Sequence, residues 1–519
     1  MRGLNPVSGG EHSRLPSPLS KPSAALPLFS WSRILRLLPL TVIVLFLSGY
    51  HPFADDADIY VAGIRRLLDP TLYPADAAFV LAHTHLSIFA HGMAAFVRLS
   101  YIPLPWVLLA AHLASIFLFL LACFQLASRL FATPAQRFGA VIMAAACFTL
   151  PVAGTALVLM DPYVTARSFS TPCGLFAVAA CLDCAWLRMA CFAALAALLH
   201  PLMAAFLIAF LILQVLVQAG RMSLAALVAI GGVAAFAAAF FLALGVSHHA
   251  PTSAAWRQAT LLPSHTYLLL ARWRWYEILG LVLPLLLFAW AAWRFRRSAA
   301  IGGLSISCLL TGSASLIVAA LFVPASGPYL LAPLQPLRSF HLIYALGVLL
   351  LGGAAGWLIP HTRWAALCFL IPAIALSLGQ HQTYGSSNFV EWPFTAPSSP
   401  WQQAFLWIGG HTPHDAVFAF NPRLVYLPGE DAQGFRAITG RDHLADDKDG
   451  GVVVVFPHLA ARWAQERAAQ TGIDLMSDAE RLPKLRSHGV TWLLLAPGAV
   501  TSFPCPYKNA AVAVCELPH

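Results

Sequence analysis

The sequence predicts an all-α membrane protein, a polytopic helical bundle of about eleven spans followed by a small soluble α/β domain. Of its 519 residues, 59% are hydrophobic and only 10% are charged, so lipid must cover most of the surface. Apolar runs of about 18 residues, each long enough to cross a hydrocarbon core, recur between Ile34 and Leu378. No such run follows Gln380. We therefore expect a disordered segment 1–30, a membrane domain 31–380 and a soluble domain 381–519.

The apolar runs give the expected spans in chain order. Between the first two, Leu81–Ser100 is interrupted by histidines and Arg98, which favours an interfacial or re-entrant helix over a span. The expected spans are Ile34–Tyr50, Pro105–Phe131, Phe138–Val158, Cys173–Arg188, a tight pair turning at His200 and ending before Arg221, Ser223–Val246, one ending at Arg294, one rising to Val323, one ending at Arg363 and one ending near Leu378.

The basic residues indicate how these spans are oriented. The formal net charge is +9, but the positive residues are dispersed in short segments between apolar runs, which speaks for membrane topology and against nucleic acid binding. Arg33 and Arg36, at the start of the first run, predict a cytoplasmic N-terminus, and the run WRFRR around Arg296 predicts a cytoplasmic loop. An odd number of spans then leaves the C-terminal domain outside, at the outer face of a bacterial inner membrane.

The C-terminal domain shows alternating helix and strand patterns. A helix is expected over Pro400–Gly409 and another over 461–472, and the apolar runs 451–457 and 490–497 are strand candidates. This order favours a partly parallel sheet. Cys505 and Cys515 can form a disulfide if the domain is outside, although a separation of ten residues permits a bridge without demanding one.

Acidic residues are scarce in the membrane half, which makes each one informative. Between Ala77 and Val390 the only acids are Asp161, Asp183 and Glu277. Asp161 and Glu277 fall in predicted outer loops, so an outward-facing cavity can collect them together with the acids of the first outer loop, 51–80. Asp183 lies toward the cytoplasmic end of its span and is expected beside Arg188.

The first outer loop carries three acids in four residues, Asp55, Asp56 and Asp58. Grouped carboxylates suit a divalent cation, Mg²⁺ or Mn²⁺, or a general base. The alternative is a solvated N-terminal cap for the helix that follows, because acids favour the first turn of a helix. Three like charges exceed what capping needs, and they repel one another unless a cation neutralises them.

Two other outer segments carry candidate anion-binding residues. Asp161 and Arg167 form either an ion pair with each other or contacts to substrate. In the segment LQPLRSFH, Arg338 favours anion binding, whereas His341 is expected to be a packed, hydrogen-bonded side chain.

The order of these parts resembles the GT-C superfamily, polytopic glycosyltransferases that use polyprenyl-phosphate sugars. The resemblance consists of the acidic motif and Tyr60 after the first span, the basic, aromatic segment 127–140 at the end of the second span, and the acid after the third, Asp161. It implies transfer of a sugar from a lipid-linked donor at the outer face of the membrane.

The resemblance also implies roles for the candidate residues. One acid of the motif DDAD, residues 55–58, is the catalytic base or a metal ligand, and the spacing of the motif leaves open which of its acids has this role. Arg167 or Arg338 contacts phosphate. The implied sets are the catalytic acids Asp55, Asp56 and Asp58, the metal ligands Asp56, Asp58 and Asp161, and the substrate contacts Tyr60, Asp161, Arg167, Arg338 and His341. The alternatives are a transporter and a non-catalytic protein of envelope assembly, and no oligomeric state is predicted.

Overall fold

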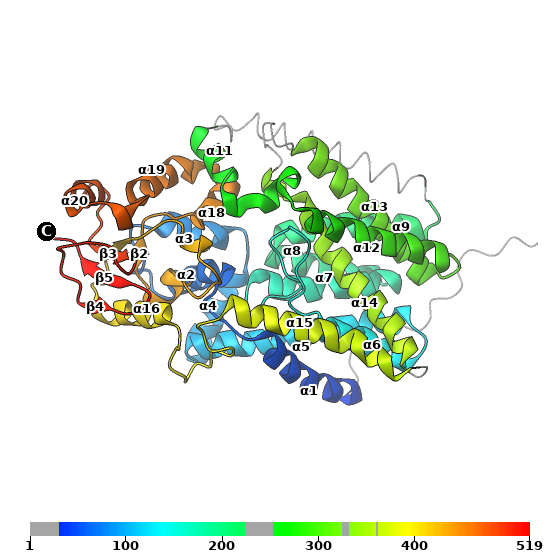
Figure 1. The fold of residues 1–519 in the computed structure, drawn as a ribbon. Coiled ribbons are helices and arrows are strands. Elements are labelled where there is room, and N and C mark those ends of the chain that lie inside the picture. The colour runs from blue at the N-terminus through cyan, green and yellow to red at the C-terminus, as the bar shows by residue number, and fades with distance from the viewer. Residues whose placement is uncertain (1–30, 222, 224–252, 324–331, 360–361, 519) are drawn as a thin grey trace, which may run out of the picture.

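The computed structural model describes residues 31–221, 223, 253–323, 332–359 and 362–518 (Figure 1). The described chain is mostly helical and carries one small sheet near its C-terminus. The predicted disordered segment 1–30 and nearly all of the predicted span Ser223–Val246 lie outside the described residues.

In the described residues up to Thr383, the regular elements are helices. They are α1 (Trp31–Ser48), α2 (Asp56–Leu68), α3 (Ala77–Ala82), α4 (Phe89–Ser100), α5 (Leu104–Leu130), α6 (Pro134–Ala146), α7 (Ala166–Leu182), α8 (Trp186–Leu199), α9 (Pro201–Gln218), α11 (Ala254–Thr260), α12 (Trp275–Arg294), α13 (Ala299–Phe322), α14 (Phe340–Leu358) and α15 (Leu367–Thr383). Short 3-10 turns connect some of them, and one of these, η5 (Pro336–Ser339), leads into α14.

Several of these helices are long and apolar, which indicates a membrane-embedded protein. In the described part of the chain, six segments are long and apolar enough to cross a membrane: Leu104–Leu130, Pro201–Gln218, Trp275–Arg294, Ala299–Leu321, Ala332–Leu358 and Trp364–Thr383. Exposed apolar side chains on α12 and α15 also indicate contact with lipid, since Leu283, Leu286, Ile371 and Ile374 are all more than half exposed.

The expected number of about eleven spans exceeds these six. The six correspond to the predicted second, sixth, eighth, ninth, tenth and eleventh spans. The apolar parts of α1, α7 and α8 are shorter than a full crossing, with fewer than 18 residues each. The turn between α8 and α9 is where the sequence predicts it, because His200 caps α9 and Pro201 begins it.

The predicted third span, Phe138–Val158, is wrong. The helix α6 begins four residues earlier, with a capping box between Thr133 and Gln136, and ends at Ala146. The rest of the apolar run is an irregular loop in which Pro151 and Val158 form an isolated bridge. Most side chains of this loop are buried by other helices, so its apolar composition reflects burial in protein and not in lipid.

The stretch predicted to be interfacial or re-entrant is bent in the structure. The helical segments Ala77–His85 and Phe89–Ser100 meet at an angle of 99°. Such a break is found in a re-entrant loop or in a broken span, and it rules out one straight crossing.

Close backbone contact joins α6 to α14. A Cβ atom built on Gly352 would lie 2.5 Å from Cβ of Met143, and one built on Gly356 would lie 2.4 Å from the carbonyl oxygen of Ala135. Small residues four positions apart let two helices of a membrane bundle approach in this way.

The C-terminal region contains a five-stranded sheet in the order β2-β1-β3-β5-β4. The first three strands are parallel and the last two are antiparallel to their neighbours, which confirms the prediction of a partly parallel sheet. The strands are β1 (Val417–Ala419), β2 (Asp442–His443), β3 (Trp492–Leu495), β4 (Tyr507–Lys508) and β5 (Ala513–Glu516), and the helices are α16 (Pro400–His411), α17 (Phe435–Thr439), α18 (Asp449–Val455), α19 (Ala460–Gln470) and α20 (Asp478–Arg486).

Helices cover both faces of this sheet, at one end of the molecule (Figure 1). Phe405 of α16 packs on one face with Phe418 and Trp492, and Leu485 of α20 packs on the other with Leu493. Cys505 and Cys515 form a disulfide beside the second face.

One strand prediction in this region is wrong, because the run 451–457 belongs largely to the helix α18 and not to a strand. Val452, Val453 and Val454 are all buried, so this segment needs consecutive apolar residues whether its backbone is a helix or a strand. A short run that is buried all round cannot distinguish a strand from a helix.

Candidate functional site

The candidate site is a cavity of about 1160 Å³ between the helical part and the C-terminal region. Both parts contribute side chains to its wall. The acidic residues that line it are Asp55, Asp56, Asp161, Glu430 and Asp447. The arginine and lysine residues that line it are Arg167, Arg338 and Lys448. Asp56, Asp161 and Arg338, predicted from separate outer segments, therefore face one cavity.

Asp55 and Asp56 reach the cavity from the start of α2. Asp55 occupies the N-cap position, but its side chain makes no capping hydrogen bond and its φ is +44°. A positive φ is strained for a residue other than glycine, and such strain gathers at functional sites. The capping alternative therefore does not account for Asp55, whose carboxylate turns to other partners.

The cation that neutralises these two acids comes from the C-terminal region. The ammonium group of Lys448 forms ion pairs with Asp55 and with Asp56, the latter with a Nζ to Oδ1 distance of 3.2 Å. Asp55 also accepts a hydrogen bond of 2.8 Å from the hydroxyl of Tyr163. Asp56 has Arg167 as a second cationic neighbour, at 3.8 Å.

Asp161 and Arg167 form an ion pair, one of the two alternatives that the sequence left open. A guanidinium nitrogen of Arg167 lies 2.7 and 2.8 Å from the two carboxylate oxygens of Asp161, and both side chains are buried. Arg167 begins the first turn of α7, directly after the irregular loop that carries Asp161. Because the helix α6 ends at Ala146, an irregular loop follows it, and this loop brings Asp161 to the cavity wall.

Arg338 differs from the other cations of the cavity. Its guanidinium group stacks over the ring of Tyr267, 5.3 Å from the centroid, and it has no carboxylate partner among the residues that the structure describes. Its Nε is buried without a hydrogen-bond acceptor. A half-buried cation in this situation is free to bind an anion.

The remaining predicted residues divide between the cavity wall and other places. Tyr60 lines the cavity. Asp58 does not, because its carboxylate accepts the backbone N–H of Ala437 at 2.7 Å. Glu277, expected near the cavity, instead accepts the backbone N–H of Arg274 at the start of α12.

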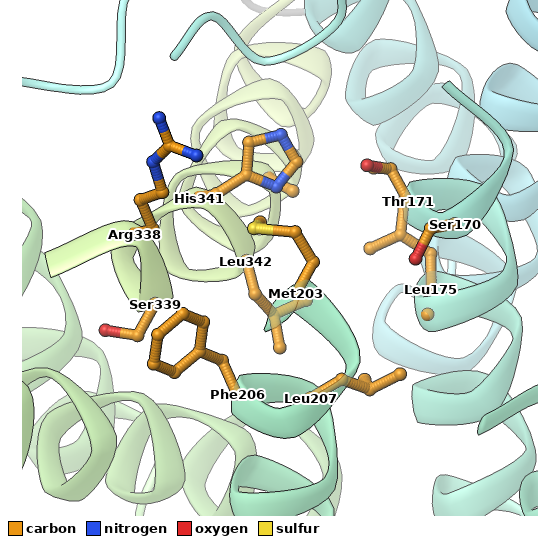
Figure 2. A pocket seen from close by; sticks show the side chains of 12 residues that line it. Ser170, Thr171, Leu175, Met203, Phe206, Leu207, Arg338, Ser339, His341 and Leu342 are labelled. Carbon is orange, nitrogen blue, oxygen red and sulfur yellow. The ribbon is translucent and has the colours of Figure 1, made fainter. Parts of the chain in front are cut away.

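His341 is packed and hydrogen-bonded, as predicted. Its Nε2 lies 2.9 Å from the carbonyl oxygen of Leu159. It lines a separate pocket of about 30 Å³, in which Figure 2 shows Arg338 and His341 near one end and Phe206 near the other. This volume holds about one water molecule. Arg338 lines both the pocket and the large cavity.

The expected pairing of Asp183 is wrong. Asp183 binds Arg129 of α5, with 2.8 Å between Nε and Oδ1, and not Arg188. The physical reason is that α7 ends at Leu182, so Asp183 and Arg188 do not lie on one continuous helix.

Charge and burial set the protonation of the cavity acids. Burial alone would raise the pKa of Asp56, but the positive charges of Lys448, Arg167 and Arg338 outweigh burial and lower that pKa below its usual range. Burial, reinforced by the negative charge of Asp55, raises the pKa of Glu430 to about 8. Asp56 is therefore ionised at neutral pH, whereas Glu430 keeps its proton and can donate or accept one near that pH.

The predicted Mg²⁺ or Mn²⁺ ligands Asp56, Asp58 and Asp161 all contact other protein groups in the structure. Each is held by a different partner: Lys448, the backbone of Ala437 and Arg167 respectively. In the described ranges, no group of three or more His, Cys, Asp or Glu side chains is placed to hold a metal ion. A divalent cation at this cavity stays a prediction.

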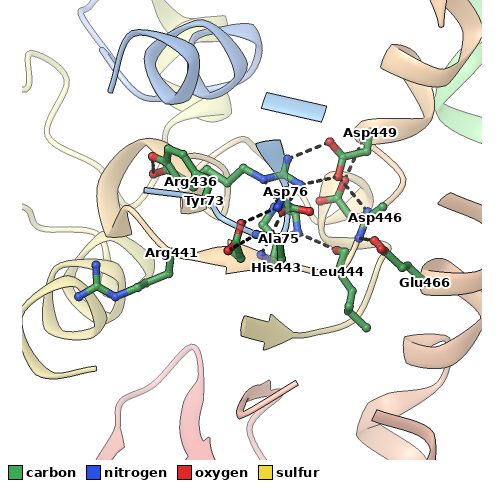
Figure 3. Close-up of polar contacts among 12 residues, drawn as sticks. Tyr73, Ala75, Asp76, Arg436, Arg441, His443, Leu444, Asp446, Asp449 and Glu466 are labelled. Atoms are coloured by element: carbon green, nitrogen blue, oxygen red, sulfur yellow. Dashed lines mark hydrogen bonds and ion pairs between the residues drawn. The ribbon is translucent and has the colours of Figure 1, made fainter. Parts of the chain in front are cut away.

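A buried network fixes the outer loop to the C-terminal region beside the cavity. Figure 3 shows Arg436 between two carboxylates, and its guanidinium nitrogens lie 2.8 Å from Asp76 and 2.8 Å from Asp449. All three residues are at most 5% exposed. Arg65 adds hydrogen bonds of 2.7 and 3.0 Å to the carbonyl oxygens of Ala437 and Ile438.

Sequence reasoning missed Lys448 and Glu430, which belong to the C-terminal region. Lys448 lies in the run DDKDG, which is typical of a solvated turn. It is, however, one of only four lysines in the chain, and that scarcity is the one signal that could have drawn attention to it.

Neither a scan against protein-family models nor a search of curated proteins gives a match to this chain.

Proposed function

We propose that this protein is a membrane glycosyltransferase of the GT-C type, which transfers a sugar from a polyprenyl-phosphate donor to an acceptor hydroxyl. One observation carries the proposal: the guanidinium of Arg338, which has no carboxylate partner in the described part of the chain, faces the same cavity as the carboxylates of Asp55, Asp56 and Asp161. An anion-binding cation beside a carboxylate that can accept a proton is what glycosyl transfer from a phosphate requires.

In the proposed reaction the acceptor oxygen attacks the anomeric carbon of the sugar, and the bond from that carbon to the phosphate oxygen breaks. The bonding electrons leave with the polyprenyl phosphate, whose added negative charge Arg338 stabilises. The carboxylate of Asp56, ionised at neutral pH, accepts a hydrogen bond from the acceptor hydroxyl and takes its proton as the bond to the anomeric carbon forms, because the attacking oxygen then becomes strongly acidic. Tyr163 and Lys448 hold Asp55, and Arg167 holds Asp161. These contacts fix the positions of the charged groups around the reacting atoms.

We place the cavity and the C-terminal region outside a bacterial inner membrane, with the N-terminus in the cytoplasm. Two observations support this orientation. Disulfides such as Cys505–Cys515 persist in oxidising compartments, and the basic run around Arg296 connects α12 and α13, where the positive-inside rule favours the cytoplasm.

The proposed function is tested by measuring lipid-linked sugars in cells that lack the protein and are complemented with variants. Cells with Asp56→Asn are expected to lose sugar transfer by about 100- to 10,000-fold and to accumulate the donor, because the proton acceptor is removed without a change of shape. Mass spectrometry of extracted lipids gives the readout, and the amount of folded protein is the control. Unchanged donor levels with this variant would exclude the proposed site, and transport of the sugar lipid into vesicles without transfer would favour a transporter.

A further inference from the structure

We infer that Lys448 is a phosphate-binding residue of this cavity, supplied by the C-terminal region, and that the donor's phosphate binds between Lys448 and Arg338. The inference rests on the proposed function and adds a residue that the membrane half of the chain does not contain.

The geometry of the ammonium group leaves it able to bind another anion. An ammonium group has three N–H donors, and Lys448 uses two, one on Asp55 and one on Asp56. Its side chain lines the cavity and is 25% exposed. The third donor is therefore available to an oxygen atom in the cavity, without loss of either ion pair.

The partners of Lys448 do not depend on it alone. Asp55 keeps the hydroxyl of Tyr163 and Asp56 keeps Arg167 as a neighbour. When a phosphate approaches, the ammonium group can shift toward it while both carboxylates retain a favourable contact. This distinguishes Lys448 from Arg167, whose pairing is the main contact of the buried Asp161.

The charges that line the cavity show why a phosphate needs this residue. Asp161 is paired with Arg167, and Asp447 is paired with Arg467 outside the cavity wall. Glu430 is uncharged near neutral pH. The two acids Asp55 and Asp56 then face two cations, Lys448 and Arg338. Without Lys448, an entering phosphate would meet two carboxylates and only one unpaired cation.

The backbone around Lys448 is held in place by contacts that do not involve the cavity. The next residue, Asp449, binds the buried Arg436. Gly450 follows, where a Cβ atom would lie only 2.6 Å from a methyl carbon of Leu262. This close approach presses the segment against the helical part and keeps the lysine directed at the acids.

The test compares binding of two probes to the full chain in detergent micelles, farnesyl phosphate and farnesol, which differ in the phosphate group. Tryptophan fluorescence gives the dissociation constants. The unmodified protein is expected to prefer farnesyl phosphate, and Lys448→Met is expected to reduce this preference about tenfold or more, the size of a hydrogen bond to a charged group. Lys448→Arg should retain most of the preference, because it keeps the charge.

Two controls separate phosphate binding from a structural role. Lys484→Met removes the same charge from the exposed surface of α20 and should leave both dissociation constants unchanged within about twofold. The background Asp55→Asn with Asp56→Asn removes the acids that Lys448 neutralises. There, adding Lys448→Met should still weaken farnesyl phosphate binding.

The outcomes are distinguishable from failure of the proposed function. If the unmodified protein binds farnesyl phosphate no better than farnesol, the donor class of the proposed function is wrong. If it prefers farnesyl phosphate and Lys448→Met does not change the preference, or changes it only when Asp55 and Asp56 are present, the role of Lys448 is overturned while the proposed function stands.

Discussion

The ion pair between Asp161 and Arg167 shows how one residue can serve both the fold and the cavity. Both side chains are nearly inaccessible, with 2% and 6% of their surfaces exposed, so each charge depends on the other. Arg167 also lies 3.8 Å from Asp56 and thereby connects the two acids predicted to act together. At such a site a loss of stability and a loss of activity have to be separated by experiment.

We expect Arg167→Met to destabilise the protein by about 3–5 kcal/mol, because it leaves Asp161 buried without a cation. The double variant Asp161→Asn with Arg167→Met removes both charges and should lose less. Thermal unfolding of the purified protein in detergent measures both. Equal losses in the two variants would mean that the ion pair is not what stabilises this part of the fold.

Glu430 is expected to make the stability of the folded protein depend on pH. Its pKa, about 8 in the folded protein and near 4.5 when unfolded, means that the folded state holds a proton that the unfolded state releases between these values. The contribution of Glu430 to stability therefore falls as pH rises from about 4.5 to 8 and is constant above that range.

Replacement of Glu430 by Gln should remove this dependence. Thermal unfolding of the unmodified protein and of Glu430→Gln, measured from pH 5 to 8, is expected to show a growing advantage of the variant as pH rises. Tyr384, whose hydroxyl lies 2.7 Å from the Glu430 carboxylate, can bond to the amide equally well. A constant difference across this range would contradict a raised pKa.

At the scale of the helices and strands, sequence reasoning succeeded where an apolar run has a clear end. The turn at His200 and Pro201 and the charges after α12 mark boundaries that the structure confirms. It failed where apolar residues are buried by protein. The loop after α6 and the helix α18 have the composition of a span and of a strand, and only tertiary packing decides their form.

The contact between α6 and α14 gives a prediction for these elements. Gly352→Ala should destabilise the protein by about 1–3 kcal/mol, because the added carbon would lie 2.5 Å from Met143 and 2.6 Å from the carbonyl oxygen of Gly139. Gly92→Ala, at a helical glycine with no atom within 4 Å, is the matched control and should be neutral or stabilising. Unfolding temperatures of the two variants in detergent test the difference, and equal temperatures would argue against close packing of α6 on α14.

For the whole molecule, the sequence predicted the broad division into a helical part and a C-terminal α/β part. It also singled out Asp55, Asp56, Asp161 and Arg338, which line one cavity in the structure. It could not find that the outer loop is bonded to residues 436–449, because contacts across some 360 residues leave no local pattern. For the same reason Lys448 and Glu430 were missed. The candidate site belongs to both parts of the chain and to neither alone.

The proposed orientation of the molecule is testable by chemical labelling in intact cells. In a background with Cys184, Cys191 and Cys368 replaced by Ser, a cysteine at the exposed Leu475 should react with a membrane-impermeant maleimide. A cysteine at Arg296 should react only after the membrane is permeabilised. The reverse pattern would place the cavity on the cytoplasmic side and overturn the proposed donor specificity.

The ion pair between Asp55 and Lys448 joins residues 393 positions apart in the chain. At synthesis rates of 5–20 residues per second, the lysine leaves the ribosome roughly 20–80 s after the aspartate. During that interval the acids Asp55 and Asp56 lack the cation that pairs with them in the folded protein. The cavity can thus be completed only after residue 448 has been synthesised, and a chain that stops before this residue cannot bind a phosphate in the proposed way.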